Sequence, residues 1–588
     1  MLNLLPRPKK IKTAEKTVLL SSFTAAKVSG IGAEHLCALK QFNPDLKIEL
    51  EEKGFWFALY TDACPEALPT EEGIDAYSLQ VSEAGVRADA KTAEGLFYAL
   101  QTFLQLPENC NCCEIFDAAS IRYRMVHWDL KGYLPHLETL KDEMRRLAAY
   151  KINAVLLELE DKYDYRCAPE VGVEGAYTFA EMREFSKFAK SLNIMIVPKL
   201  QSIAHVDYIL KHDRYKHLRE NNHVFQFCPS NPEVHTLWTA MCDELLECFA
   251  EHGPYFHIGA DEPSYLGECP ECAKIGKAAC YLRKVNACVE YVVSKNRIPI
   301  MWDDIIRNHY GLFTPEEADH LRKTLGKQAI IMYWAYGYGG KRNEFPYTKE
   351  YLDAGIKVWG ASGYAGCDNW AGSIPPLNIR GLNIDAWSKE AVANGLESVC
   401  TTGWTRIGSA DCPAEPQEGC WFTILYAAAS MWNPEVCDYG TFVDSLARQL
   451  YGAPVDEALK AAILHIGQNA YPYQNVLSSP EDEPEELKTL KILAAAESLS
   501  TKQNILVSKF QYYDLKLGKK MEDYRYGQIV NFAKGLLEEV SAIREALQTH
   551  LSRYYKEVTV AEVIATRVNC LEKLTHQLLN LMETTEKY

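Results

Sequence analysis

Short runs of apolar residues recur at regular intervals between residues 120 and 430. They are almost continuously hydrophobic, as strands buried on both faces must be. Segments with apolar residues at helical spacing, such as Leu137–Tyr150 and Phe179–Leu192, lie between them. The eight predicted strands are Met125–Leu130, Ile152–Leu159, Ile194–Leu200, Phe256–Ala260, Ile298–Trp302, Ala329–Ala335, Ile356–Ser362 and Ser398–Trp404. Eight alternating strand–helix units in about 300 residues predict an α/β fold, a (β/α)8 TIM barrel over residues 119–430.

The flanking regions follow other patterns. Residues 1–118 carry the short β-rich runs Lys47–Glu51, Phe55–Tyr60 and Tyr77–Val81, followed by a helical pattern from Thr92 to Leu106, which predicts a small non-catalytic α/β domain. Residues 431–588 are predicted to be helical, because the segments 485–517, 524–552 and 558–585 repeat apolar residues every 3.6 positions. These helices either cover the barrel or form a homodimer contact, and the pattern is compatible with both. An open doubly wound sheet is a weaker alternative for the middle region, because no Gly-rich phosphate turn follows its first strand.

Composition and charge narrow the class of protein. Of the 588 residues, 47% are hydrophobic and 24% are charged, which excludes disordered and fibrous classes. The formal net charge of −17 leaves no basic footprint for nucleic acid. The N-terminal stretch lacks the apolar segment of a secretory signal, and no run of about 18 apolar residues predicts a membrane span. The 19 cysteines are scattered and odd in number, which favours a reducing cytoplasm.

One cysteine pair is spaced like a pair of metal ligands. Cys269 and Cys272 are separated by two residues, but a structural zinc site needs four ligands. The other close group, Cys110, Cys112 and Cys113, lies far away in the chain. The sequence therefore favours free thiols and predicts no metal.

Polar and aromatic residues gather at the ends of the predicted strands. Active-site groups of such barrels project from the C-terminal ends of the strands. The residues at these positions are Asp129, Lys131, Glu160, Asp161, Gln201, His205, Asp261, Glu262, Trp302, Asp303, Asp304, Trp334, Tyr364, Asp368, Trp404 and Arg406. A cup of aromatic rings with a few carboxylates is typical of sugar binding, because the rings cover C–H faces and the carboxylates accept hydroxyl hydrogen bonds.

The most specific element is the segment His257–Glu262, in which the carboxylates of Asp261 and Glu262 are adjacent after a buried strand and a glycine. An acid pair at the start of a helix is the ordinary alternative. A conventional retaining glycosidase needs two carboxyls about 5–5.5 Å apart on opposite sides of the bond. Adjacent residues suit a substrate-assisted mechanism better, in which the 2-acetamido oxygen of the sugar attacks the anomeric carbon.

These motifs resemble glycoside hydrolase family 20, the β-N-acetylhexosaminidases, and are most similar to its hexosaminidase D branch. The resemblance covers roughly residues 75–430. It rests on the segments Leu96–Leu106, Arg124–Asp129, Pro198–His205, His257–Glu262 and Thr402–Trp404. Ala260 stands where most members have a second glycine.

The resemblance implies a carbohydrate substrate with a terminal N-acetylhexosamine, no cofactor, and a role for each matching residue. Asp261 would orient the acetamido group, and Glu262 would be the general acid and then the base, with His205 supporting both. Arg124 would hold O3 and O4 of the sugar. The remaining substrate-binding residues would be Asp129, Trp302, Trp334, Tyr364, Trp404 and Arg406, although Gly363–Asp368 departs from the usual family stretch. A general acid working near neutral pH needs a raised pKa, which apolar walls and a nearby carboxylate provide.

Arg406 bears on the sugar epimer. Many members place a glutamate two residues after the last strand's tryptophan to bind O4 and O6, whereas this chain has Trp404-Thr-Arg406. Either Arg406 forms an ion pair at the rim, or it faces the sugar and axial O4 is tolerated. The second alternative predicts that N-acetyl-β-galactosaminides are cleaved at least as well as N-acetyl-β-glucosaminides.

Two other classes of function compete with hydrolysis. A sugar-binding protein that had lost catalysis would normally lack one of the two acids, and both are present. A deacetylase would need a set of metal ligands, and the His and Asp positions do not cluster at ligand spacing.

Overall fold

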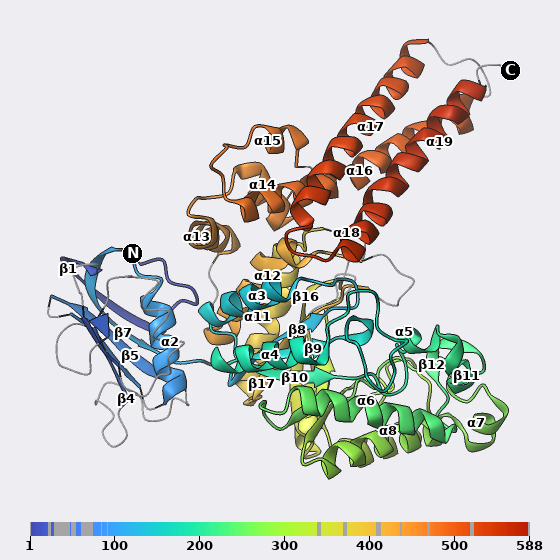
Figure 1. Ribbon diagram of the computed structural model, residues 1–588, viewed down its shortest axis with the longest axis horizontal. Helices are drawn as coiled ribbons and strands as arrows, with labels where there is room; N and C mark the ends of the chain where they lie inside the picture. The colour runs from blue at the N-terminus through green and yellow to red at the C-terminus, as the bar shows by residue number, and fades with distance from the viewer. Residues whose placement is uncertain are drawn as a thin grey trace.

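The computed structural model describes three parts of the chain, an N-terminal sheet, a central barrel and C-terminal helices (Figure 1). The described residues are 2–20, 25–28, 47–48, 55–59, 75–83, 85–90, 92–337, 343–367, 373–406, 413–435, 438–466, 471–517 and 523–585. Residues 49–51, Tyr60 and Asp368, which the sequence analysis assigned, lie outside these ranges.

The N-terminal part contains a mixed sheet, and helix α2 is the helix that the structure describes there. Within the described residues the strand order is β1 (Lys10–Leu19), β7 (Asn109–Asp117), β5 (Tyr77–Ser82), β6 (Gly85–Ala90), β4 (Phe55–Leu59), β2 (Ala25–Val28) and β3 (Lys47–Ile48). Helix α2 (Ala93–Phe103) begins at Thr92, whose side chain accepts a hydrogen bond from the Gly95 N–H at 3.0 Å. The sequence pattern missed β1 because this edge strand is mostly exposed and therefore lacks an apolar alternation.

The central part is a closed barrel of eight parallel strands, which confirms the predicted fold class. The strands are β8 (Tyr123–Asp129), β9 (Ala154–Glu158), β10 (Met195–Lys199), β13 (Tyr255–His257), β14 (Ile298–Trp302), β15 (Ile330–Trp334), β16 (Val358–Ala365) and β17 (Ser398–Gly403). Side chains that point inward, among them Met125, Leu156, Ile300 and Trp359, form a separate core inside the barrel. Side chains on the other face pack against the surrounding helices.

Helices surround the barrel in the order expected for this fold. Helix α4 begins with a capping box in which Thr178 and Glu181 bond each other's backbone N–H groups. The main helices are α3 (Leu137–Ala149), α4 (Phe179–Ser191), α6 (Pro232–Cys248), α8 (Lys277–Ser294), α9 (Pro315–Leu325), α10 (Pro346–Asp353), α11 (Leu377–Asn394) and α12 (Gln417–Trp432). Between β10 and α6 the chain inserts α5 (Asp207–Leu210) and the hairpin of β11 (Arg219–Glu220) and β12 (His223–Phe227), which lie beside α7 (Pro270–Ile275) in Figure 1.

The C-terminal helices pack on the loops at the carboxyl end of the barrel. The Lys556 N–H donates to the Leu134 carbonyl at 2.9 Å, and the His136 N–H donates to the Tyr554 carbonyl at 2.8 Å. The helices are α13 (Tyr439–Tyr451), α14 (Glu457–Leu464), α15 (Tyr473–Leu477), α16 (Glu485–Leu517), α17 (Asp523–Leu551), α18 (Glu557–Ile564) and α19 (Cys570–Thr585). The segment predicted as one helix over 558–585 contains a π-helical turn at Ala565–Asn569. The helices therefore cover part of the barrel, whereas a dimer contact stays a prediction.

The predicted domain boundaries fall near element ends. Residue 118 lies between β7 and β8, and residue 430 lies in the last turn of α12. Within the described ranges, no helix combines the length and the apolar character that crossing a membrane requires.

Candidate active site

The turn after β13 presents two adjacent acids at the mouth of the barrel. Gly259, Ala260 and Glu262 have φ angles of +65°, +73° and +50°, in the left-handed region. A Cβ atom on Gly259 would lie 1.8 Å from Oε1 of Gln201, so this position requires glycine. The Gly259 N–H donates to Nδ1 of His257 at 3.0 Å, and Tyr281 donates to the Ala260 carbonyl at 2.8 Å. A short, strained and well-anchored turn therefore fixes the direction of the acids.

The two acids meet on one histidine. Nε2 of His205 lies 3.2 Å from Oε2 of Glu262 and 3.4 Å from Oδ2 of Asp261. His205 follows β10, has a φ of +54°, and its ring packs edge-on against Phe225 at 4.5 Å. The three residues predicted to be catalytic are thus together in space.

Glu262 has two further partners. Tyr310 donates to Oε1 of Glu262 at 2.6 Å, and the Glu262 N–H donates to Oδ2 of Asp304 at 3.1 Å. Burial raises the pKa of Glu262, but hydrogen bonds from His205 and Tyr310 outweigh it and hold the pKa at about 2. The predicted raised pKa of the general acid is therefore wrong for this arrangement of the site.

The proton of this group resides on the histidine. Burial lowers the pKa of His205, but the charges of Asp261 and Glu262 outweigh burial and raise it above 6.5. Asp304 is fully buried, and burial together with the charges of Asp261 and Asp303 raises its pKa well above the ordinary range. Asp304 is therefore protonated and neutral, and it adds no negative charge to the site.

A second charged group lies beside the acids at the ends of β8, β9 and β10. Oε2 of Glu158 lies 2.7 Å from Nζ of Lys199, 3.1 Å from Nε2 of His127 and 3.8 Å from Nζ of Lys131. Burial lowers the pKa of Lys131, but the carboxylates of Asp129, Glu158, Glu160 and Asp261 raise it strongly. Lys131 is therefore a buried cation within electrostatic reach of Asp261.

Aromatic rings cover the same region. Trp404 is half-buried, and its indole N–H donates to the Tyr336 hydroxyl at 3.0 Å. Trp334, also half-buried, stacks on the Tyr336 ring at 5.3 Å. Trp302 has no exposed surface, because it packs against His257 at 4.6 Å and Trp404 at 5.7 Å. Trp302 therefore supports the mouth from below and is not part of its wall.

Asp129 lies at the mouth, but both of its oxygens bind the protein. Oδ1 accepts the Lys131 N–H at 3.0 Å, and Oδ2 accepts the Thr405 N–H at 2.9 Å. Asp129 thus ties the loop after β8 to the loop after β17, next to Trp404.

The predicted sugar contact of Arg124 is wrong. Arg124 is fully buried near the start of β8, and its guanidinium donates to Asp75 at 2.8 Å and to the Lys151 carbonyl at 2.7 Å. Its charge lies over the rings of Tyr98 and Trp432 at 5.3 and 4.9 Å. Because neighbouring strand residues point to opposite faces, the inward direction of Met125 sends Arg124 outward.

The predicted acetamido contact of Tyr364 is also wrong. Tyr364 points to the outer face of β16, its ring covers Gly403, and its hydroxyl donates to the His127 carbonyl at 3.3 Å. This direction again follows from strand alternation, since Trp359 and Ala361 on the same strand point inward.

Arg406 forms ion pairs within the protein and does not face the sugar site as a free cation. It is 4% exposed, and its guanidinium lies 3.5 Å from Asp161 and 3.4 Å from Glu562 of α18. Of the two alternatives, the rim ion pair holds, so the argument from Arg406 to axial O4 loses its premise.

The sequence analysis did not assign a role to Tyr310, Asp304 or Glu158. Asp304 and Glu158 stand at strand ends, which is a usable signal. Tyr310 lies eight positions beyond Trp302 in a loop, and no local pattern marks it.

Comparisons with known proteins identify a family that the chain matches. Residues 122–358 match the model of the glycosyl hydrolase family 20 catalytic domain, and residues 1–122 match domain 2 of that family. Hexosaminidase D of Bos taurus is 28% identical over 302 residues, which cover 48% of this chain and 84% of the relative. Hexosaminidase D of Homo sapiens is 28% identical over 303 residues, which cover 48% of this chain and 60% of the relative.

A solved structure shows a similar fold over nearly the full length. The chitobiase of Flavobacterium johnsoniae superimposes with a TM-score of 0.59 and 18% sequence identity, covering 99% of this chain and 94% of that one. At this identity the likeness concerns the fold.

Proposed function

The chain belongs to glycoside hydrolase family 20, and from this premise we propose that it is an exo-acting β-N-acetylhexosaminidase. Its substrates would be terminal, non-reducing N-acetyl-β-galactosamine and N-acetyl-β-glucosamine residues. The mechanism would be retaining and substrate-assisted. The observation that carries the proposal is the sharing of one histidine nitrogen by two sequence-adjacent acids at the mouth of the barrel.

In the first step, Asp261 orients the nucleophile. Its Oδ1 is buried and has no hydrogen-bond partner among the described atoms, so it is placed to accept the acetamido N–H of the sugar. The acetamido carbonyl oxygen then forms a bond to the anomeric carbon while the glycosidic C–O bond breaks. The developing positive charge of the oxazolinium ring lies next to the Asp261 carboxylate, which stabilises it.

Glu262 supplies the proton that the leaving oxygen needs. Glu262 itself receives this proton from His205, whose Nε2 is 3.2 Å from Oε2 of Glu262. The sugar displaces water from the half-exposed Glu262, which raises the pKa of the carboxyl and moves the proton along this hydrogen bond. In the second step the ionised Glu262 takes a proton from water, and the water oxygen bonds to the anomeric carbon from the face that the leaving group left. The bond between the anomeric carbon and the acetamido oxygen breaks at the same time, which restores the acetamido group.

The half-buried rings of Trp334 and Trp404 would pack on the sugar, with Trp302 beneath them. The buried cation of Lys131 adds positive charge near Asp261. The proposal covers both epimers, because Arg406 is held by carboxylates of the protein. A cytoplasmic location is part of the proposal, since none of the fifteen cysteines of the described residues forms a disulfide.

The test uses 4-nitrophenyl glycosides of both N-acetylhexosamines and of the matching sugars without the acetamido group. We expect kcat/KM to be at least about 10³-fold lower without that group, because an oriented internal nucleophile is lost. Product analysis by NMR should show retention at the anomeric carbon. Comparable turnover of a plain β-galactoside would overturn the mechanism, and binding of the amino sugar without hydrolysis would indicate a binding protein.

Two substitutions separate the roles of the acids. Glu262→Gln should spare substrates with good leaving groups relative to poor ones, whereas Asp261→Asn should slow both classes, by about 10²–10⁴-fold. Glu290→Gln on the exposed face of α8 is the matched control and should behave like the native protein. If both active-site variants showed the same dependence on the leaving group, the assignment of roles would be wrong.

A further inference from the structure

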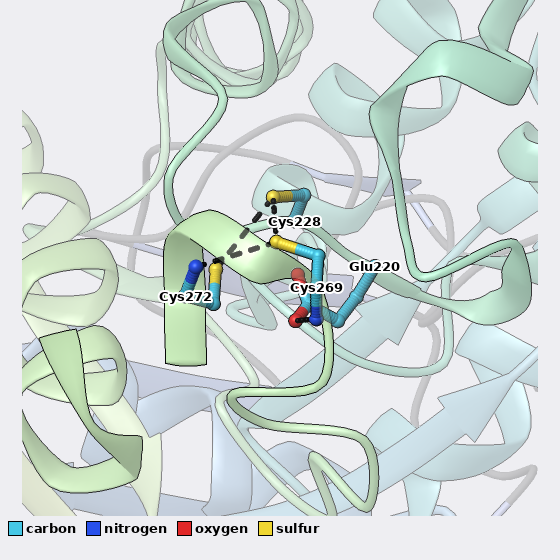
Figure 2. A group of neighbouring side chains, drawn as sticks. All are labelled: Glu220, Cys228, Cys269 and Cys272. Atoms are coloured by element: carbon cyan, nitrogen blue, oxygen red, sulfur yellow. Dashed lines mark hydrogen bonds between the residues drawn. The ribbon is translucent and has the colours of Figure 1, made fainter. Parts of the chain in front are cut away.

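Four side chains from three separate segments converge beside α7. Cys269 and Cys272 flank the start of α7, Cys228 directly follows β12, and Glu220 ends β11. Figure 2 shows the three sulfur atoms directed toward one another, with the Glu220 carboxylate next to Cys269. One ligand atom from each of the four residues lies within 4.8 Å of the others.

The spacing of the sulfur atoms fits a tetrahedral metal centre. Sγ of Cys228 is 3.7 Å from Sγ of Cys269 and 3.7 Å from Sγ of Cys272. Zinc–sulfur bonds are about 2.3 Å, so two thiolates on one tetrahedral zinc ion are about 3.8 Å apart. A disulfide would require about 2.05 Å, which these pairs do not approach.

The buried carboxylate of Glu220 has no cationic partner among the residues that the structure describes. Its side chain is fully buried, Oε1 accepts the Cys269 N–H at 2.7 Å, and Oε2 has no hydrogen-bond partner among the described atoms. No Lys, Arg or His of the described residues forms an ion pair with it. A buried carboxylate is costly unless a cation neutralises it.

Polar groups that can donate hydrogen bonds lie next to two of the sulfur atoms. The Cys272 N–H donates to Sγ of Cys269 at 3.4 Å, and Oγ of Ser230 lies 3.0 Å from Sγ of Cys272. Hydrogen-bond donors around coordinating sulfur atoms are a regular feature of metal sites.

We propose that Cys228, Cys269, Cys272 and Glu220 bind one zinc ion. Three thiolates and a carboxylate complete the four-coordinate shell that marks a structural zinc site, with no open position for catalysis. Binding exchanges the three thiol protons for the metal. The sequence analysis expected free thiols because it looked for a second pair among Cys110, Cys112 and Cys113, whereas the fold supplies the missing ligands from the hairpin.

The ion would join two segments that border the active site. The hairpin carries Phe225, which packs on His205, and Gln226, whose Oε1 accepts the Tyr265 N–H at 2.9 Å. Tyr265 lies in the chain between Glu262 and Cys269. The proposal does not depend on the sugar chemistry, because its test measures metal content.

The experiment measures zinc by elemental analysis in protein purified under reducing conditions without chelator. We expect about one zinc per chain in the native protein, and less than about 0.2 in Cys228→Ser and Cys272→Ser. Cys280→Ser is the matched control, because Cys280 is equally buried and adjacent but donates to the Cys272 carbonyl from outside the four-residue set. It should keep about one zinc.

A second measurement uses the native chain, in case the variants fail to fold. Protein freed of zinc and titrated with Co²⁺ should show the visible and near-ultraviolet bands of tetrahedral cobalt thiolate, saturating at one equivalent. Purified protein with no zinc that also gives no such bands would overturn the proposal. So would a disulfide between two of these cysteines in non-reducing peptide mapping, or full zinc content in the folded Cys228→Ser and Cys272→Ser variants.

Discussion

At the scale of single residues, the location of one proton sets the state of the site. The carboxylates of Asp261 and Glu262 both contact Nε2 of His205, and together they hold the proton on the imidazole. Tyr310 strengthens this by donating a hydrogen bond of 2.6 Å to the Glu262 carboxylate, which stabilises its charged form. Glu262, whose pKa is about 2, therefore receives its proton from His205 and does not need a raised pKa of its own in the free protein.

The pH dependence of the reaction should report His205. Its folded pKa lies above 6.5, so the protonated pair is present below that pKa and is lost as the pH rises through it. For a substrate with a poor leaving group, we expect kcat/KM to fall on the alkaline side with an apparent pKa above 6.5. His205→Gln should remove this limb and lower kcat by about 10²-fold or more.

The control for this experiment is His217→Gln, which removes an exposed histidine paired with Glu233. It should leave the profile unchanged between pH 5 and 9. An alkaline limb at the same pH in His205→Gln would assign the titration to another group.

At the scale of the element, the turn after β13 does the positioning. Three of its four residues from Gly259 to Glu262 have positive φ angles, and the turn is held by His257, Tyr281 and Asp304. Gly259 is required by contact with Gln201, whereas Ala260 merely tolerates its conformation at a cost of about 1–2 kcal/mol. Of these two adjacent positions, the first therefore requires glycine and the second accepts alanine.

Exchanging glycine and alanine at these two positions should disrupt the site at Gly259 and be tolerated at Ala260. Gly259→Ala should lower the melting temperature and abolish activity, because its Cβ overlaps Gln201 and its φ is left-handed. Ala260→Gly should leave stability within about 1 kcal/mol, since relief of strain offsets the added freedom of the unfolded chain. The measurement is thermal unfolding with activity on the nitrophenyl substrate, and a fully active Gly259→Ala would contradict this account of the turn.

At the scale of the whole molecule, buried polar contacts join the three parts. Arg124 of the barrel pairs with Asp75 of the N-terminal part, between the rings of Tyr98 and Trp432. On the other side, Arg406 pairs with Glu562 of the C-terminal helices. The barrel is thus bound to both flanking parts by charges that the sequence analysis had placed at the sugar.

Arg124→Met should act on stability and not on substrate affinity. Removing the arginine leaves Asp75 buried without its partner, which costs about 3–5 kcal/mol. We expect a lower melting temperature with KM within about twofold of the native value at 25 °C. Arg122→Met, two positions earlier and exposed, is the control and should change neither quantity. A large rise in KM with unchanged stability would restore Arg124 to the sugar site.

The sequence by itself determined the features that depend on neighbouring residues in the chain. Eight apolar runs predicted eight barrel strands, because a strand buried on both faces must be continuously hydrophobic. The adjacency of Asp261 and Glu262 needs no tertiary contact, and helical periodicity located α3, α4, α16 and α17.

Only the tertiary structure decided which face of a strand each polar residue occupies. Both faces of a barrel strand are buried, so hydrophobicity cannot distinguish the inward His127 from the outward Arg124 and Tyr364. It also decided which distant residues meet, as Tyr310 meets Glu262 and Cys228 meets Cys269 and Cys272, because such contacts are set by the packing of loops and not by spacing in the chain.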